Sequence, residues 1–95
     1  MMFARTVWIS GKVQKVGYRA FVKQTAITYQ LKGFACNHPD GRVEVLFVGA
    51  SIDDIDLAIE TLKKGPPQAQ IEHVIAFSSS EPTTLSEDFL ICSKF

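Results

Sequence analysis

The sequence lacks the features that mark several large classes of protein. Ten lysines and arginines balance ten aspartates and glutamates, so the formal net charge is zero. A broad electrostatic attraction to nucleic acid or to an anionic membrane is therefore not expected, although one local basic site is compatible with this balance. The longest apolar stretch, around residues 45–50, is far too short to span a bilayer. The first ten residues have no apolar core of a signal peptide.

Cysteine and histidine are also scarce. The two cysteines, Cys36 and Cys92, are too few for a disulfide framework, and we expect them to be reduced and partly buried, as in a cytosolic protein. The two histidines, His38 and His73, have no metal-site spacing to each other or to the cysteines. The sequence therefore predicts a cytoplasmic protein without a metal or another cofactor.

The residues that are present suit one compact domain spanning residues 1–95. The hydrophobic content is 46% and the charged content is 21%, values typical of soluble globular proteins. Residue periodicity predicts two helices, at 18–31 and from Ser51 to Lys64, with Gly33 and Ser51 as caps. Alternating apolar residues predict strands at 3–13, 34–37, 42–48, 71–77 and 89–92.

This order of elements predicts an α+β fold. Strand, helix, strand, strand, helix and strand form the ferredoxin-like βαββαβ sandwich, in which two helices cover one face of an antiparallel sheet. The segment 89–92 adds a short C-terminal strand, expected at an edge. Because this fold supports many unrelated functions, function must be argued from a site.

The first candidate site is the stretch Gly11 to Arg19, between the first strand and the first helix. Consecutive backbone N–H groups in such a loop can converge on one anion, and the helix N-terminus adds its dipole. Arg19 can add a bidentate guanidinium contact. The Gly-Lys-Ser/Thr ending of a Walker loop is missing. Alone the loop is weak evidence, because strand-to-helix loops with glycine are common.

The second candidate site is the stretch 33–43, whose middle reads Asn-His-Pro-Asp-Gly. Taken alone, these residues favour a hairpin in which Asn37 simply caps the turn. His38 is expected to be an exposed turn residue, and Trp8 is expected to pack on the sheet. The acidic residues 53–56 are expected to be a solvated helix start rather than a metal site.

Together, the two stretches make a more specific pattern, and the chain resembles the acylphosphatase family from end to end. The family's loop Gly-x-Val-Gln-Gly-Val-x-Phe/Tyr-Arg matches residues 11–19 except at Lys15. Its hairpin Gly-Trp-Val-x-Asn-x-x-Asp-Gly-x-Val matches residues 33–43 except at Phe34 and Ala35. Residues 65–71 and 89–91 also match the family pattern.

The resemblance implies a hydrolase that converts an acyl phosphate to a carboxylate and inorganic phosphate without a metal. It implies that Arg19 is the catalytic arginine and that Asn37 positions the attacking water. The phosphate cradle would consist of Lys15, Val16, Gly17, Tyr18 and Arg19. We expect a monomer that binds this small substrate and its phosphate product, with no nucleic-acid or membrane partner.

The chemistry is compatible with these residues. The leaving carboxylate has a low pKa, so the reaction needs little help from a general acid. The phosphoryl transition state spreads negative charge over its equatorial oxygens, which hydrogen-bond donors and a guanidinium can stabilise. A neutral carboxamide at position 37 can accept a hydrogen bond from water without repelling the phosphate, as an aspartate would.

Lys15 is the main departure from the family, because glycine normally stands there and permits unusual backbone angles. Lysine either places its ammonium near the phosphate or distorts the cradle, and we expect reduced but retained activity. One alternative is therefore a catalytically impaired domain that serves as a ligand-binding or interaction module.

Two further alternatives have less support. An RNA-recognition module of the same topology needs paired aromatic residues that segment 42–48 lacks. A domain of a larger carbamoyl-transferring enzyme is not favoured, since no linker follows in the sequence.

Overall fold

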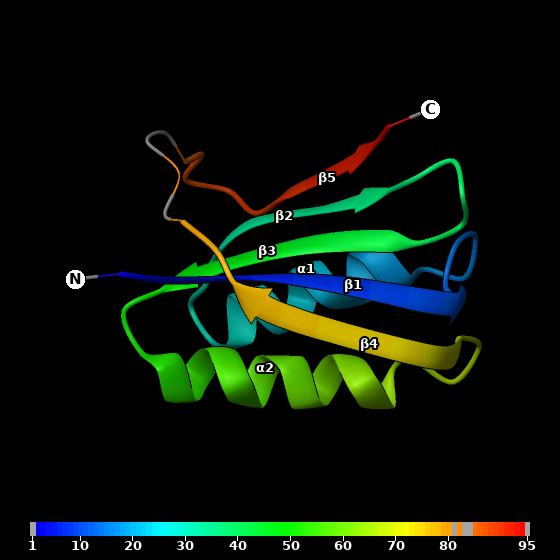
Figure 1. The fold of residues 1–95 in the computed structure, drawn as a ribbon, viewed down its shortest axis with the longest axis horizontal. Helices are drawn as coiled ribbons and strands as arrows, with labels where there is room; N and C mark the ends of the chain where they lie inside the picture. Colours follow the sequence, from blue (N-terminus) through cyan, green and yellow to red (C-terminus); the bar gives the residue numbers. More distant parts are fainter. Residues whose placement is uncertain (1, 81, 83–84, 95) are drawn as a thin grey trace.

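The computed structural model describes residues 2–80, 82 and 85–94, and within them it confirms the predicted order of elements (Figure 1). The elements are β1 Phe3–Lys12, α1 Tyr18–Thr28, β2 Lys32–Asn37, β3 Val43–Gly49, α2 Ile52–Lys64, β4 Gln70–Ser78 and β5 Leu90–Ser93. Neither helix in this part of the chain is long and apolar enough to cross a membrane.

The five strands form one sheet in the order β4-β1-β3-β2-β5. The first four are antiparallel, as predicted, whereas β5 runs parallel to β2 at the edge of the sheet. The sheet is therefore mixed rather than antiparallel. Its fifth strand returns after a long connection in the same direction as β2, which a hairpin cannot achieve.

Both helices pack on the same face of the sheet (Figure 1). The core between the layers is built from alternate residues of the strands and one stripe of each helix, as periodicity requires. Its fully buried members include Val7, Ile9, Val45, Phe47, Val22, Ala26, Ile55 and Leu62. Ser51 caps α2 as predicted, because its Oγ accepts a hydrogen bond of 3.2 Å from the backbone N–H of Asp54.

The end of α1 differs from the prediction. The helix stops at Thr28, and Gln30 adopts a left-handed φ of 57° just beyond it. Gly33, predicted as the helix cap, instead lies within β2. A Cβ atom at position 33 would lie 1.8 Å from the carbonyl oxygen of Leu46 on β3. Glycine is therefore needed there for the close approach of two strands, which helical periodicity does not reveal.

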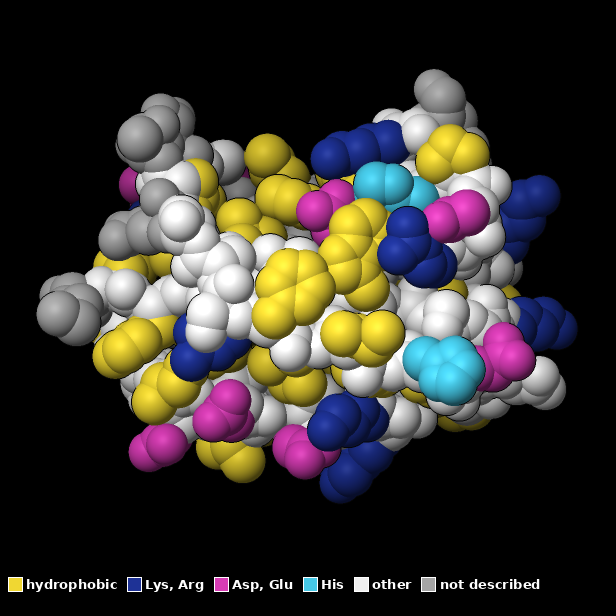
Figure 2. Space-filling model, in the orientation of Figure 1, with side chains coloured by type: hydrophobic (Ala, Val, Ile, Leu, Met, Phe, Trp, Pro, Cys, Tyr) yellow, Lys and Arg dark blue, Asp and Glu magenta, His cyan; other side chains and the backbone are white. Residues whose placement is uncertain are grey.

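The face of the sheet away from the helices carries hydrophobic side chains with histidine and basic residues beside them (Figure 2). Trp8 packs there as predicted, with the Arg42 guanidinium 4.1 Å from its ring centroid. His38, predicted to be an exposed turn residue, is instead half-buried against Trp8, and its Nε2 lies 2.8 Å from Glu44 Oε1. His73 is exposed on β4, as predicted.

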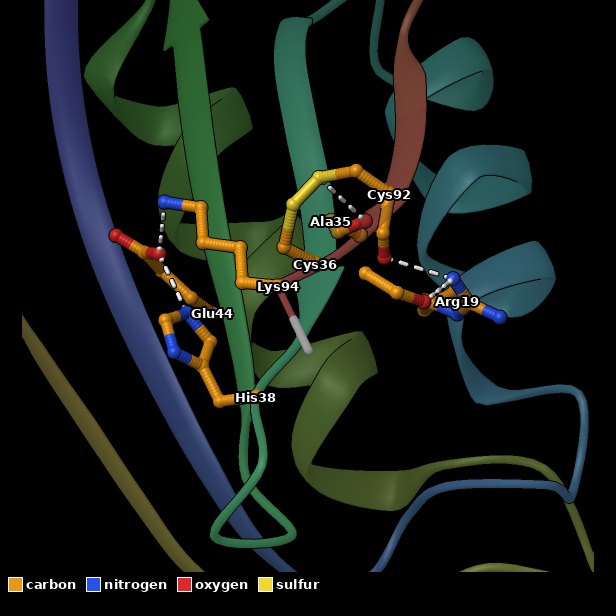
Figure 3. Close-up of a disulfide and its surroundings, with 8 residues drawn as sticks. Arg19, Ala35, Cys36, His38, Glu44, Cys92 and Lys94 are labelled. Atoms are coloured by element: carbon orange, nitrogen blue, oxygen red, sulfur yellow. Dashed lines mark hydrogen bonds and ion pairs between the residues drawn. A yellow bond between two sulfur atoms is a disulfide. The ribbon is translucent and has the colours of Figure 1, made fainter.

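The prediction of two reduced cysteines was wrong, because Cys36 and Cys92 form a disulfide (Figure 3). The two residues face each other across the parallel pair β2 and β5, with their Cα atoms 4.5 Å apart. This distance lies within the range that a disulfide requires. The pairing depends on the position of β5, so no local pattern around either cysteine could indicate it.

Candidate active site

The loop between β1 and α1 leads into a helix start whose backbone donors have no side-chain partner among the described residues. Lys15 and Gly17 both have left-handed φ angles, 62° and 75°. Gly17 is the N-terminal cap of α1, and no side chain accepts a hydrogen bond from the first turn. The first turn also contains no acidic residue. These N–H groups and the helix dipole therefore remain available to an anion.

The loop borders a cavity of about 180 Å³ that also reaches the end of β2. It is lined by Val13, Lys15, Gly17, Tyr18, Arg19, Ala20, Asn37 and Ile91. The structure thus brings Asn37 together with four of the five predicted cradle residues. Val16 does not line the cavity, and its half-buried side chain packs against the core. The lining contains two cationic side chains and no carboxylate, so it favours an anionic ligand.

No group of three or more His, Cys, Asp or Glu side chains that could hold a metal occurs in the described residues. The ligand-binding potential of this cavity therefore rests on nitrogen donors and one carboxamide.

Asn37 contributes a buried carboxamide beside this cavity. It is the last residue of β2 and only 6% exposed, and its Oδ1 has no hydrogen-bond partner among the described residues. Buried polar atoms are nearly always paired, so an unpaired one on a residue that lines a cavity suggests a donor that the protein does not supply.

The turn beside Asn37 is closed by another residue. Asp40 Oδ1 accepts a 3.0 Å hydrogen bond from the backbone N–H of Arg42. This bond, and a second from the Arg42 guanidinium, lower the pKa of Asp40. Asn37 is thus not the residue that caps the turn.

Arg19 is positioned by contacts with β5, the edge strand beside β2. Its Nη1 donates to the carbonyl oxygen of Cys92 at 2.7 Å and to Ser93 Oγ at 3.0 Å, both on β5 (Figure 3). Its Nε and Nη2 donors make no hydrogen bond within the described part of the chain. The guanidinium is therefore oriented by one nitrogen while its other donors stay available.

Tyr18 lines the cavity, but its hydroxyl is bonded to another part of the protein. Its hydroxyl donates a 2.9 Å hydrogen bond to the carbonyl oxygen of Leu62 in α2. Burial raises the pKa of this phenol far above its usual value, so it stays neutral at physiological pH. The side chain joins the two helices and fixes the start of α1 beneath the cavity.

Gln14 supports this region through contacts that its sequence context does not indicate. Its Nε2 donates to the carbonyl oxygens of His38 at 2.8 Å and Arg42 at 3.0 Å. One amide group thus joins the loop to the hairpin that follows Asn37. The residue is part of the family-like loop motif, but its partners lie 24 and 28 residues away, beyond the reach of any local pattern.

We expect Gln14→Glu to lower kcat/KM for an acyl phosphate by roughly 10-fold to 100-fold, because a shift of about 1 Å between reacting groups can cost that much. The carboxylate has the same shape but cannot donate to either carbonyl oxygen. Steady-state kinetics with benzoyl phosphate measure the effect. Gln24→Glu, on the exposed side of α1, is the matched control. Equal activity of the two variants would contradict this role of Gln14.

The fold and the site define a small α+β sandwich with a cationic cavity at the N-terminus of its first helix. Comparison with known proteins identifies the family. The model of the acylphosphatase family matches residues 5–91. An acylphosphatase from Chromohalobacter salexigens is 41% identical over 75 residues, which cover 79% of this chain and 82% of that relative. The chain belongs to the acylphosphatase family.

Solved structures agree with this assignment. An acylphosphatase from Coxiella burnetii superposes with a TM-score of 0.86 at 33% identity, covering 95% of this chain and 92% of that one. HypF from T. kodakarensis superposes with a TM-score of 0.79 at 31% identity, covering 95% of this chain but 12% of HypF. The same sandwich thus occurs as most of a small chain and as a small part of a much larger one.

Proposed function

We propose that this acylphosphatase hydrolyses acyl phosphates by in-line attack of a water molecule that Asn37 positions on a phosphoryl group held by Arg19 and the loop 15–19. The observation that carries the proposal is the shared cavity. Asn37, whose buried Oδ1 is unpaired among the described residues, lines the same cavity as Arg19 and the start of α1. The cavity therefore offers separate places for a water and for an anion.

The phosphoryl group would be bound by backbone and guanidinium donors. Within the described residues, the N–H groups at the start of α1 have no side-chain acceptor, and Arg19 keeps its Nε and Nη2 donors. Donors fixed before the reaction stabilise the charge that develops on the equatorial oxygens, without reorganising during the reaction. This mechanism uses no metal or other cofactor.

The attacking water would donate a hydrogen bond to Asn37 Oδ1. Holding the water in line with the departing carboxylate removes part of the entropic cost of the reaction. The carboxylate leaves without protonation because its conjugate acid has a low pKa. The products are the free carboxylate and inorganic phosphate. We further propose that the chain acts as one domain, as a monomer, in the cytoplasm.

Isotope transfer from the solvent tests this mechanism. Benzoyl phosphate is hydrolysed in H₂¹⁸O in the presence of a chelator, and both products are analysed by mass spectrometry. Attack on phosphorus places the label in phosphate, whereas attack on the carbonyl carbon places it in benzoate. Label in benzoate, or loss of activity with the chelator, would contradict the proposal.

Lys15 is expected to assist anion binding rather than to disrupt the loop. It adopts the left-handed conformation that glycine takes easily, and it lines the cavity. We expect Lys15→Met to raise the phosphate inhibition constant about fivefold, the loss of roughly 1 kcal/mol from one charge near a solvated anion.

The second substitution at this position, Lys15→Gly, should weaken phosphate to the same extent, because both variants remove the charge. Lys64→Met, at the exposed end of α2, is the matched control. Stronger phosphate inhibition in Lys15→Gly than in the unmodified protein would show that the lysine is merely tolerated.

A further inference from the structure

The candidate catalytic arginine depends on an edge strand for its position. Both acceptors of Arg19 Nη1 belong to β5, a strand of four residues whose single neighbour in the sheet is β2. Short edge strands are held weakly by their ladder alone. The orientation of the guanidinium therefore depends on how firmly β5 is attached to β2.

The Cys36–Cys92 disulfide provides this attachment next to both candidate catalytic residues. The carbonyl oxygen of Cys92 is the nearer of the two acceptors of Arg19 Nη1, at 2.7 Å against 3.0 Å for Ser93 Oγ. Cys36 is 1% exposed and immediately precedes Asn37. The backbone N–H of Lys94 also donates to the carbonyl oxygen of Asn37 at 2.8 Å. Figure 3 shows the cross-link between the strand of Asn37 and the strand that Arg19 contacts.

We propose that the Cys36–Cys92 disulfide positions Arg19 relative to Asn37, so that the thiol redox state of the protein sets its phosphate affinity and turnover. This inference rests on the mechanism proposed above. Cleavage removes the covalent link between β2 and β5 and leaves β5 held by its backbone pairing with β2, so that β5 is freer to shift along or away from β2. The acceptors of Arg19 then move with β5, while Asn37 stays on β2.

The reaction that changes the state is thiol–disulfide exchange with a dithiol. One thiolate of the dithiol attacks a protein sulfur, the S–S bond breaks, and the second thiolate resolves the mixed disulfide. The protein gains two electrons and two protons as two thiols, and the dithiol becomes a cyclic disulfide. Cys92 is only half-buried, and Lys94 lines the same surface groove as both cysteines.

Wild-type protein in its two redox states provides the test. Intact mass and thiol titration first establish a disulfide in the oxidised form and two thiols after dithiothreitol. Benzoyl phosphate kinetics and the phosphate inhibition constant are then measured at a temperature at which circular dichroism shows both forms folded. We expect reduction to raise the phosphate inhibition constant and lower kcat/KM by roughly 10-fold to 100-fold, and reoxidation to restore both.

Two sets of variants separate positioning from simple stabilisation. A Cys36→Ser/Cys92→Ser variant should behave as the reduced protein and ignore dithiothreitol. In Arg19→Gln, reduction should leave the phosphate inhibition constant unchanged, because the displaced group is already gone. If the reduced protein unfolds at every assay temperature, a Cys36→Ala/Cys92→Val variant is compared with the oxidised protein instead. Its apolar side chains fill the volume of the disulfide without linking the strands.

The outcomes are distinct. Absence of a disulfide in air-oxidised protein would overturn the inference, and so would identical kinetics of the two folded redox states. An oxidised protein that fails to hydrolyse benzoyl phosphate would contradict the proposed mechanism instead. A lower melting temperature with unchanged kinetics would show that the disulfide only stabilises the fold.

Discussion

Arg19→Gln is expected to lower kcat for benzoyl phosphate by about 10²–10³-fold, the usual cost of removing one well-placed donor to a transition state. Its Nη1 is oriented by two acceptors on β5, so the remaining donors are fixed before substrate arrives. Such pre-organisation is lost with glutamine, which is shorter and uncharged. We therefore expect the phosphate inhibition constant to rise as well, since the ground-state anion uses the same donors.

Two further substitutions sharpen this result. Arg19→Lys keeps the charge but loses the planar fork, so its activity should fall between those of the glutamine variant and the unmodified protein. Arg5→Gln makes the same chemical change on β1, away from the cavity, and should leave both constants unchanged. Full activity in Arg19→Gln would remove this residue from the mechanism.

Asn37→Ala is expected to lower kcat by about 10²-fold, the order of effect that loss of a positioned reactant produces. The phosphate inhibition constant should stay nearly unchanged, because the carboxamide is assigned to water and not to the phosphoryl group. Rapid assays of benzoyl phosphate hydrolysis, together with phosphate inhibition, measure the two effects separately. This split between turnover and phosphate affinity distinguishes Asn37 from Arg19.

The same substitution should cost the fold little. Asn37 Oδ1 makes no hydrogen bond within the described residues, so its removal leaves no new unpaired group behind. The melting temperature of Asn37→Ala should therefore stay close to that of the unmodified protein. A large drop would mean that the side chain stabilises the hairpin, and unchanged turnover would contradict its role in catalysis.

Local patterns were sufficient to predict most of the fold. Alternation in β1 and helical spacing in α2 follow from which face of each element is buried, whereas β3 is buried on both faces apart from Glu44. Ser51 caps α2 as its chemistry requires. The end of α1 was less predictable, because glycine is needed at position 33 for close contact with the β3 backbone and not for ending the helix.

The pairing of β5 was not accessible from sequence. Its four residues carry no signal of strand direction, and the parallel register with β2 depends on the chain returning across the sheet. The disulfide was missed for the same reason, since it forms only once that register is set.

The candidate site was predicted in part. The family resemblance implied roles for Arg19 and Asn37, and both residues line one cavity in the structure. It could not indicate how they are supported, because Gln14, Cys92 and Ser93 act through contacts between distant segments. Tertiary contacts of this kind depend on the packed arrangement of whole elements and not on local propensity.

The left-handed backbone at Lys15 has a consequence for how such a loop can change over time. A residue with a Cβ follows the same path that glycine prefers, so neighbouring residues, and not residue 15 itself, dictate that path. The position thus accepts a long side chain as well as glycine while the amide donors keep their directions. A change of side chain at position 15 can therefore alter the electrostatic potential in the cavity without changing the backbone donors of the loop.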